Sequence, residues 1–197
     1  MADRTADISR ETKETKIRLA LNVDGTGDYT IATGVGFFDH MLTHIARHGL
    51  LDLRIEGTGD LEVDAHHLVE DVGIVFGQAL AAAVGDKRGI VRYGTGMAPM
   101  DTSLVMVTLD LSGRPALVWN VDLPIGKVGD FDTELAREFF QAVANNAAMT
   151  VHFHLFSGGN AHHVLESAFK SFGRALDAAT TLDPRIVGQI PSTKGAL

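Results

Sequence analysis

The chain has 197 residues, of which 45% are hydrophobic, so it can bury a full core as one large domain or as two small fused units. It contains no cysteine, which excludes disulfides and thiolate chemistry and leaves histidine and carboxylate groups as metal ligands. The formal net charge of −8, with 17 dispersed basic residues, argues against nucleic acid as a partner. Residues 1–16 are polar, and no apolar run approaches the roughly 18 residues that cross a bilayer, which predicts a cytoplasmic protein without a membrane partner.

The first half of the chain predicts two strands, a short helix, a strand and a long helix. Apolar and polar residues alternate from Thr15 to Val23, and a Gly-containing turn leads into Tyr29 to Thr33, which together predict a β-hairpin. Apolar residues at helical spacing predict a helix from Phe37 to His48. A strand from Leu51 to Glu56 and a helix from Ala65 to Val84 follow.

The second half predicts the same order. Leu104 to Leu111 and Ala116 to Val121 are expected to form a second hairpin around a Gly-Arg-Pro turn. A helix from Thr133 to Ala147, a strand from Thr150 to Phe156 and a helix from Ala161 to about Ala178 complete the pattern.

Residue identities support an internal duplication. The segment Asp64–Glu70, Asp-Ala-His-His-Leu-Val-Glu, matches Asn160–Glu166, Asn-Ala-His-His-Val-Leu-Glu. We therefore predict an α+β fold in which a ββαβα half is repeated with pseudo-twofold symmetry and sheets pack against helices. The repeats span about 10–90 and 91–185 within a single domain, 1–197.

The repeated motif has the spacing of a metal site. Residues i and i+4 lie above one another on a helix, so His66 with Glu70, and His162 with Glu166, can each present an imidazole and a carboxylate to one ion. The second histidines, His67 and His163, lie about 100° around the helix from their neighbours and serve a different metal, or one shared with another helix or subunit. Core packing does not explain two such copies at matching places.

Further ligands are expected on the two shorter helices, where His40 and Glu138 occupy related positions. His152, in a strand, is a weaker candidate, whereas His44, His48 and His154 are interpreted as structural. Imidazole and carboxylate without thiolate suit Mn²⁺, Fe²⁺ or Zn²⁺, and the carboxylates favour Mn²⁺. Residues of positive charge at turns or near the motifs could bind an anion only if they converge in space.

Several longer motifs together resemble imidazoleglycerol-phosphate dehydratase over nearly the whole chain. They are Gly34-Val35-Gly36-Phe37-Phe38-Asp39-His40-Met41-Leu42, both His-His-x-x-Glu motifs, Phe169-Lys170-Ser171-Phe172-Gly173-Arg174-Ala175-Leu176 and Pro191-Ser192-Thr193-Lys194-Gly195. The resemblance implies a lyase of histidine biosynthesis that dehydrates imidazole glycerol phosphate to imidazole acetol phosphate. It also implies two Mn²⁺ ions per active site and a homo-oligomer of 24 subunits.

The resemblance also implies roles for individual residues. Glu14 matches the family's acid/base glutamate, although by itself it reads as one charge in a polar segment. The implied metal ligands are His40, His66, His67, Glu70, Glu138, His162, His163 and Glu166. The implied phosphate contacts are Arg92, Arg114, Lys170, Ser192 and Lys194, the last two in a C-terminal substrate-binding tail.

The chain departs from the family pattern at Leu68, where many relatives have Thr, at Thr102, where an acid is common, and at Glu138, where some have His. Two alternatives remain at this point. A two-metal phosphoester hydrolase would release inorganic phosphate. A shell whose metals only join subunits would leave no open coordination position.

Overall fold

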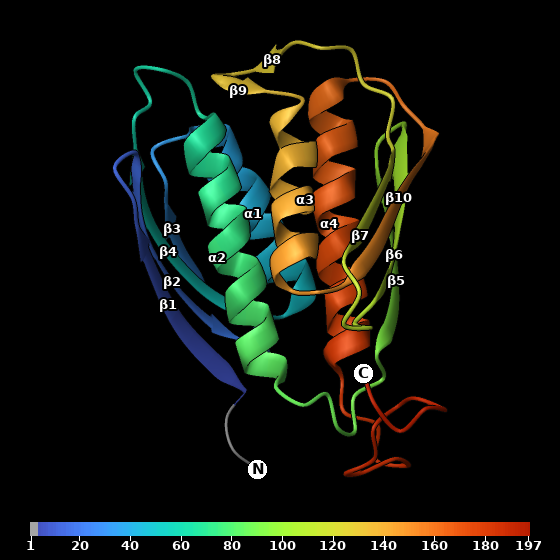
Figure 1. Ribbon diagram of the computed structural model, residues 1–197. Coiled ribbons are helices and arrows are strands. Elements are labelled where there is room, and N and C mark those ends of the chain that lie inside the picture. Colours follow the sequence, from blue (N-terminus) through green and yellow to red (C-terminus); the bar gives the residue numbers. More distant parts are fainter. Residues whose placement is uncertain (1–3) are drawn as a thin grey trace.

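Two four-stranded sheets flank a central layer of four helices in the computed structural model, which describes residues 4–197 (Figure 1). Strands with one buried and one exposed face alternate apolar and polar residues, while the helices between the sheets are apolar on several sides. The fold is α+β, as predicted.

The first half of the chain forms one sheet and two helices, in the order βββαβα. Strand β1 pairs with β2, β2 with β4, and β3 with the other edge of β4. The elements are β1 (Thr5–Glu11), β2 (Thr15–Asn22), β3 (Tyr29–Ala32), α1 (Gly36–Gly49), β4 (Asp52–Gly59) and α2 (His66–Val84).

The second half repeats this order and its strand arrangement, β5-β6-β10-β7, with a small two-stranded insertion before its first helix. Each sheet therefore contains three antiparallel strands and one parallel edge strand. The elements are β5 (Tyr93–Met100), β6 (Ser103–Asp110), β7 (Ala116–Asn120), β8 (Lys127–Val128), β9 (Phe131–Asp132), α3 (Leu135–Asn146), β10 (Thr150–Ser157) and α4 (Ala161–Thr180).

Both predicted hairpins are wrong, and the repeated unit has one strand more than predicted. Strands β2 and β3 do not pair, because β4 lies between them, and β10 separates β6 from β7 in the same way. The true hairpins are β1–β2 and β5–β6. Strand β1 escapes prediction because it is polar and lies at a sheet edge with little burial. Strand β5 escapes it because it contains Gly94, Gly96 and Pro99, which disfavour strands.

The glycines of β5 are required by the helix that packs against it. A Cβ atom at Gly94 would lie 1.8 Å from the carbonyl oxygen of Ala175, and one at Gly96 would lie 1.9 Å from that of Ser171. Only glycine lets the strand and α4 approach so closely.

The four helices pack as two equivalent pairs, α1 with α4 and α2 with α3. A Cβ atom at Gly173 would lie 2.8 Å from the carbonyl oxygen of Ile45, and one at Gly77 would lie 2.8 Å from that of Val143. Gly77 and Gly173 are as far apart in sequence as His66 and His162, so the same backbone contact is made in both halves. The α1–α4 and α2–α3 pairs are therefore equivalent in the duplicated fold.

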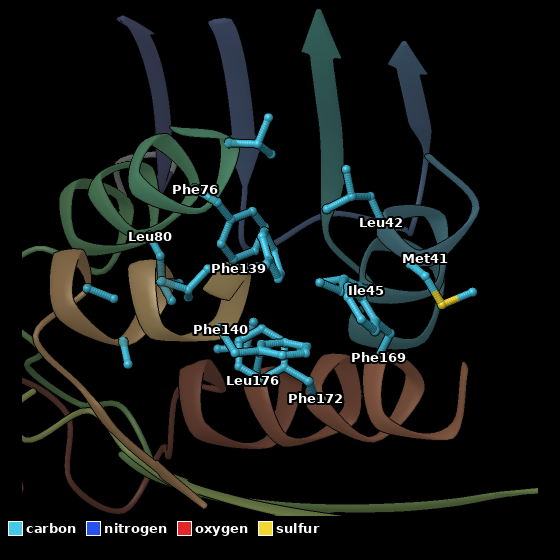
Figure 2. Close-up of a cluster of buried hydrophobic side chains, with 14 of the residues drawn as sticks. Met41, Leu42, Ile45, Phe76, Leu80, Phe139, Phe140, Phe169, Phe172 and Leu176 are labelled. Atoms are coloured by element: carbon cyan, nitrogen blue, oxygen red, sulfur yellow. The ribbon is translucent and has the colours of Figure 1, made fainter. Parts of the chain in front are cut away.

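Aromatic side chains from the two halves meet in one core (Figure 2). Phe139 and Phe140 of α3 face Phe169 and Phe172 of α4, with the Phe140 and Phe169 ring centroids 4.7 Å apart. Phe76 from α2 packs against Phe139. These contacts join α2, α3 and α4 in one shared core.

Helix α2 is long and apolar enough to cross a bilayer. This corrects the expectation that no apolar run has that length. The helix packs on β1, β2 and α3, and most of it is buried within the protein, which is typical of a core helix.

We predict that Gly77→Ala and Gly173→Ala each lower the free energy of unfolding by about 1–3 kcal/mol, because the added methyl group meets backbone that cannot rotate away. Urea denaturation measures the effect. Gly36→Ala is the matched control, since a Cβ atom there has no neighbour within 4 Å. Equal stabilities for all three variants would contradict the close helix contact.

Candidate metal centre

The two motif helices begin in the same way. The backbone N–H of His66 donates to Oδ1 of Asp64 at 2.7 Å, and the N–H of His162 donates to Oδ1 of Asn160 at 2.8 Å. A side-chain acceptor two residues before the first histidine satisfies a free N–H group of the first turn. The Asp or Asn that opens each motif therefore fixes where the histidines enter the helix.

One cluster of metal-binding groups forms where α1 meets α4. Within residues 4–197, His40, His162 and Glu166 make the one group of three such side chains whose ligand atoms all lie within 4.8 Å of one another. Nε2 of His162 is 3.2 Å from Oε2 of Glu166, and Nε2 of His40 is 3.8 Å from the same oxygen. Two imidazoles and a carboxylate suit a divalent transition metal, so these residues fit the predicted ion.

The two carboxylate oxygens of Glu166 have different partners. Oε2 faces the two histidines, whereas Oε1 accepts from Nζ of Lys170 at 2.5 Å and lies 3.4 Å from Nε2 of His44. Burial raises the pKa of Glu166, but the hydrogen bond from Lys170 and the charge of His44 outweigh it, and the pKa falls below its usual value. The carboxylate is thus ionised and oriented, with one oxygen directed to the cluster.

His44 is one turn beyond His40 on α1 and belongs to this environment. Burial lowers the pKa of His44 to about 4, and Glu166 opposes that shift only in part. His48, a further turn along, has a pKa lowered by burial and then by the charges of Lys170 and Arg174. The three histidines at spacing i, i+4, i+8 form a ladder along α1.

The first half holds its motif residues in pairs. Nε2 of His66 is 3.9 Å from Oε2 of Glu70. Nδ1 of His67 is 3.0 Å from Oδ2 of Asp60 and 3.9 Å from Oε2 of Glu14. The hydrogen bond with Asp60 raises the pKa of His67 above its usual value, burial opposes that shift, and the charge of Glu14 adds to it.

Equivalent contacts recur in the second half. Nδ1 of His163 lies 3.6 Å from Oδ2 of Asp101, in the β5–β6 turn that corresponds to the β1–β2 turn of Glu14. Glu138, in the first turn of α3, pairs with Arg137 at 3.0 Å and is not part of the described three-residue cluster. His152 lies on β10, where it pairs with Thr108 of β6 and Val118 of β7, and it is not part of the described three-residue cluster.

The predicted phosphate contacts other than Lys170 are not gathered around this cluster. The N–H of Arg92 donates to the carbonyl of Ala179, 17 residues beyond His162, which places it about 25 Å away along α4. The buried Arg92 guanidinium binds both oxygens of Asp110, at 2.7 and 3.0 Å, and the carbonyl of Pro191 at 2.8 Å. Arg114 is 3.8 Å from Asp110.

The residues after α4 form a tail at the same end of the molecule as Arg92, which binds the carbonyl of Pro191 in that tail. The C-terminus lies near the last turn of α4 (Figure 1). The N–H of Lys194 donates to Oγ of Ser192 at 3.2 Å. Lys170 stands apart, in the middle of α4, bound to Glu166. The chain therefore carries its predicted metal ligands and most of its predicted phosphate contacts at opposite ends of the helix layer.

Comparison with known proteins identifies the family. The family model described as imidazoleglycerol-phosphate dehydratase matches residues 33–176. The imidazoleglycerol-phosphate dehydratase of Azorhizobium caulinodans is 60% identical over 98% of both chains, and that of Dinoroseobacter shibae is 58% identical over 98% of this chain and all of the other. The chain belongs to the imidazoleglycerol-phosphate dehydratase family.

Solved structures agree with this assignment. Imidazoleglycerol-phosphate dehydratase from Staphylococcus aureus is 46% identical, with a TM-score of 0.82 over 90% of this chain and 99% of that one. The enzyme from Pyrococcus furiosus is 37% identical, with a TM-score of 0.84 over 96% of this chain and all of the other. The chain is thus a hydro-lyase of histidine biosynthesis that acts on a small phosphorylated substrate, and the phosphoester hydrolase alternative has no support.

Several charged residues that contact the predicted site residues of this dehydratase cannot be singled out from the sequence. Asp60, Asp101 and Asp110 each hold a histidine or arginine, yet a single aspartate in a turn or strand end has no diagnostic spacing. For His44 a signal does exist, because its i+4 spacing from His40 places both on the α1 face toward Glu166.

We predict that His44 makes the metal-free dehydratase less stable as the pH falls from 6.5 toward 4. The unfolded chain protonates this histidine near the ordinary histidine pKa of 6.5, whereas the folded chain does so only near 4, so the unfolded state binds more protons in that window. The free energy of unfolding should fall by up to about 1 kcal/mol per pH unit.

Urea denaturation of chelator-treated protein at several pH values measures this slope. His44→Gln should flatten it, while Thr43→Ala, a neighbouring change without a titrating group, should leave it as it is. Identical slopes in the parent and His44→Gln would show that His44 is charged in the folded protein.

Proposed function

We propose that the enzyme uses two Mn²⁺ ions per active site, and that Glu14 acts as the acid/base of the dehydration. The observation that supports this most directly is the approach of His40 and His162 to one oxygen of the ionised Glu166. The proposed metal ligands are His40, His66, His67, Glu70, Glu138, His162, His163 and Glu166.

Glu138 is assigned by the equivalence of the helix pairs. The contact of Gly173 with Ile45 sets His40 of α1 beside His162 and Glu166 of α4. The contact of Gly77 with Val143 sets α3 against α2 in the same manner, with Glu138 at the end where His66 and Glu70 lie. A carboxylate in place of imidazole exchanges a nitrogen ligand for an oxygen ligand, which Mn²⁺ accepts.

The doublets support two metal centres shared between copies of the chain. His66 approaches Glu70, whereas His67 turns to Asp60 and Glu14, so the two rings diverge. Nδ1 of His67 is engaged by Asp60, which leaves its Nε2 for a metal. Because one helix cannot direct both rings to one ion, a neighbouring subunit would complete each centre.

Phosphate binding is proposed for Arg92, Arg114, Lys170, Ser192 and Lys194, with the residues after α4 as a substrate-binding tail of a single domain, 1–197. The separation of about 25 Å along α4 is too long for one small substrate, which favours sites that join the metal end of one subunit to the tail end of another. This reasoning supports a homo-oligomer, for which we propose 24 subunits in the cytoplasm.

The chemistry can be divided among these groups. Bound metal would supply Lewis-acid binding of the substrate imidazole, which weakens the bond to the hydroxyl on the adjacent carbon. The exposed carboxylate of Glu14, 3.9 Å from His67, would take the proton from the next carbon, and the hydroxyl would leave as water. The resulting enol would become the ketone, and the arginine and lysine groups would hold the phosphate throughout.

We predict that Glu14→Gln loses turnover while retaining Mn²⁺ content and thermal stability, because glutamine keeps the shape and hydrogen bonding but cannot accept the proton. The assay follows imidazole acetol phosphate formation by Mn²⁺-loaded protein, with bound metal quantified in the same samples. Lys13→Gln, a change in the same exposed turn, is the matched control. Near-normal turnover of Glu14→Gln would exclude it as the essential base.

Another prediction concerns a site that joins the metal end of one subunit to the tail end of another. Glu14→Gln changes only the metal end and Lys194→Ala changes only the tail end. In an equal mixture of the two variants, about one site in four should therefore combine an unchanged metal end with an unchanged tail end. Co-expression with two different tags and tandem purification isolates the mixed oligomers. Turnover well above that of either variant alone is expected. Turnover no higher than the mean of the two variants would place both residues in a site built by one subunit.

A further inference from the structure

A buried carboxylate lies behind the proposed catalytic turn and has no part in the chemistry described above. Asp71 follows Glu70 on α2 and is 7% exposed. Its Oδ1 accepts from Nε of Arg10 at 2.8 Å, and its Oδ2 accepts from the hydroxyl of Thr15. Arg10 belongs to β1 and Thr15 to β2, so one acid of the metal-binding helix holds both strands that flank the Glu14 turn.

A short relay connects this carboxylate to the backbone of Glu14. The hydroxyl of Thr15 lies 3.2 Å from that of Thr12. Oγ1 of Thr12 in turn accepts from the N–H of Glu14 at 3.1 Å and from the N–H of Thr15 at 3.0 Å. Because hydroxyl groups can donate and accept at once, the chain from Asp71 to the turn is continuous.

The duplicated half shows that the fold does not require an acid at this position. Ser167 stands where Asp71 does, one residue after the motif glutamate. Its hydroxyl donates to the carbonyl of Ala98 at 2.6 Å and accepts from the N–H of Val105 at 2.8 Å, so it binds strands directly and does not lead to Asp101 in the turn. Among the described residues, the relay is found only in the half that carries Glu14.

We propose that Asp71 is a positioning residue for the dehydration, which keeps the Glu14 carboxylate at a fixed distance from the metal-binding face of α2. The proposal rests on the base role of Glu14 stated above. His67, Glu70 and Asp71 share one helix, so whatever binds to that face and the turn tied to Asp71 move together. Displacement of a reacting group by about 1 Å lowers the rate on the order of a hundredfold, so the relay from Asp71 to the Glu14 turn would matter for turnover.

The experiment breaks the relay at both ends. Asp71→Asn keeps the shape but cannot accept from both Arg10 and Thr15, and Thr12→Val removes the hydroxyl that accepts from Glu14 at an exposed position where folding is not at risk. Thr12→Ser restores that hydroxyl. Ser167→Ala is the matched change in the other half, and Glu14→Gln reports on the base itself.

Expected for Asp71→Asn and Thr12→Val is a fall in kcat of about tenfold to a hundredfold with KM changed by less than about threefold. Mn²⁺ affinity, measured by the paramagnetic resonance signal of the free ion, should match the parent. Thr12→Ser should return kcat to near the parent value, and Ser167→Ala should affect stability more than kcat.

Three results would overturn the proposal. The first is an unchanged kcat in both relay variants while Glu14→Gln is inactive, which removes the positioning role but keeps the base. The second is a loss of Mn²⁺ affinity in step with kcat, which assigns Asp71 to the integrity of the metal helix instead. The third is normal turnover of Glu14→Gln, which removes the base that Asp71 would position.

Discussion

The close backbone contact at Gly173 and its counterpart at Gly77 is the constraint on which the site depends. A side chain at either glycine would push the paired helices apart, and His40 reaches Glu166 only because α1 and α4 touch at this point. The aromatic core below then fixes the helices against sliding. A metal requires its ligands to be positioned to within tenths of an ångström. Here backbone packing, which side-chain motion does not disturb, sets the positions of the helices that carry the candidate ligands.

The duplication and the helices could be predicted from the sequence because both leave regular patterns. Two copies of His-His-x-x-Glu define the register of the repeat, and apolar spacing locates all four helices to within a few residues. Strand pairing was not predictable in this way. The order β1-β2-β4-β3 depends on which strands pair with the two edges of β2, and the polar sequence of β1 does not mark it as one of them.

The site was predictable where its residues are periodic and not where they act singly. His66 and Glu70, like His162 and Glu166, are recognisable by their i+4 spacing. Asp60 has no such pattern, although it orients His67 through its carboxylate and donates its backbone N–H to the carbonyl of Glu14. A residue whose importance comes from the spatial meeting of three segments is invisible until the turn and the helix are placed together.

The two halves have kept one architecture and diverged in what stands beside the motif. Glu14 lies in a turn tied to its neighbours, whereas Asp101, its counterpart, is a shorter acid with a left-handed backbone φ of 47° in a two-residue turn. Conversely, Glu166 is buried and bound by Lys170, whereas Glu70 is half exposed. The two equivalent scaffolds therefore place the predicted ligands by symmetry, and a few asymmetric acids are enough to give one half the proposed base and the other a buried, fixed carboxylate.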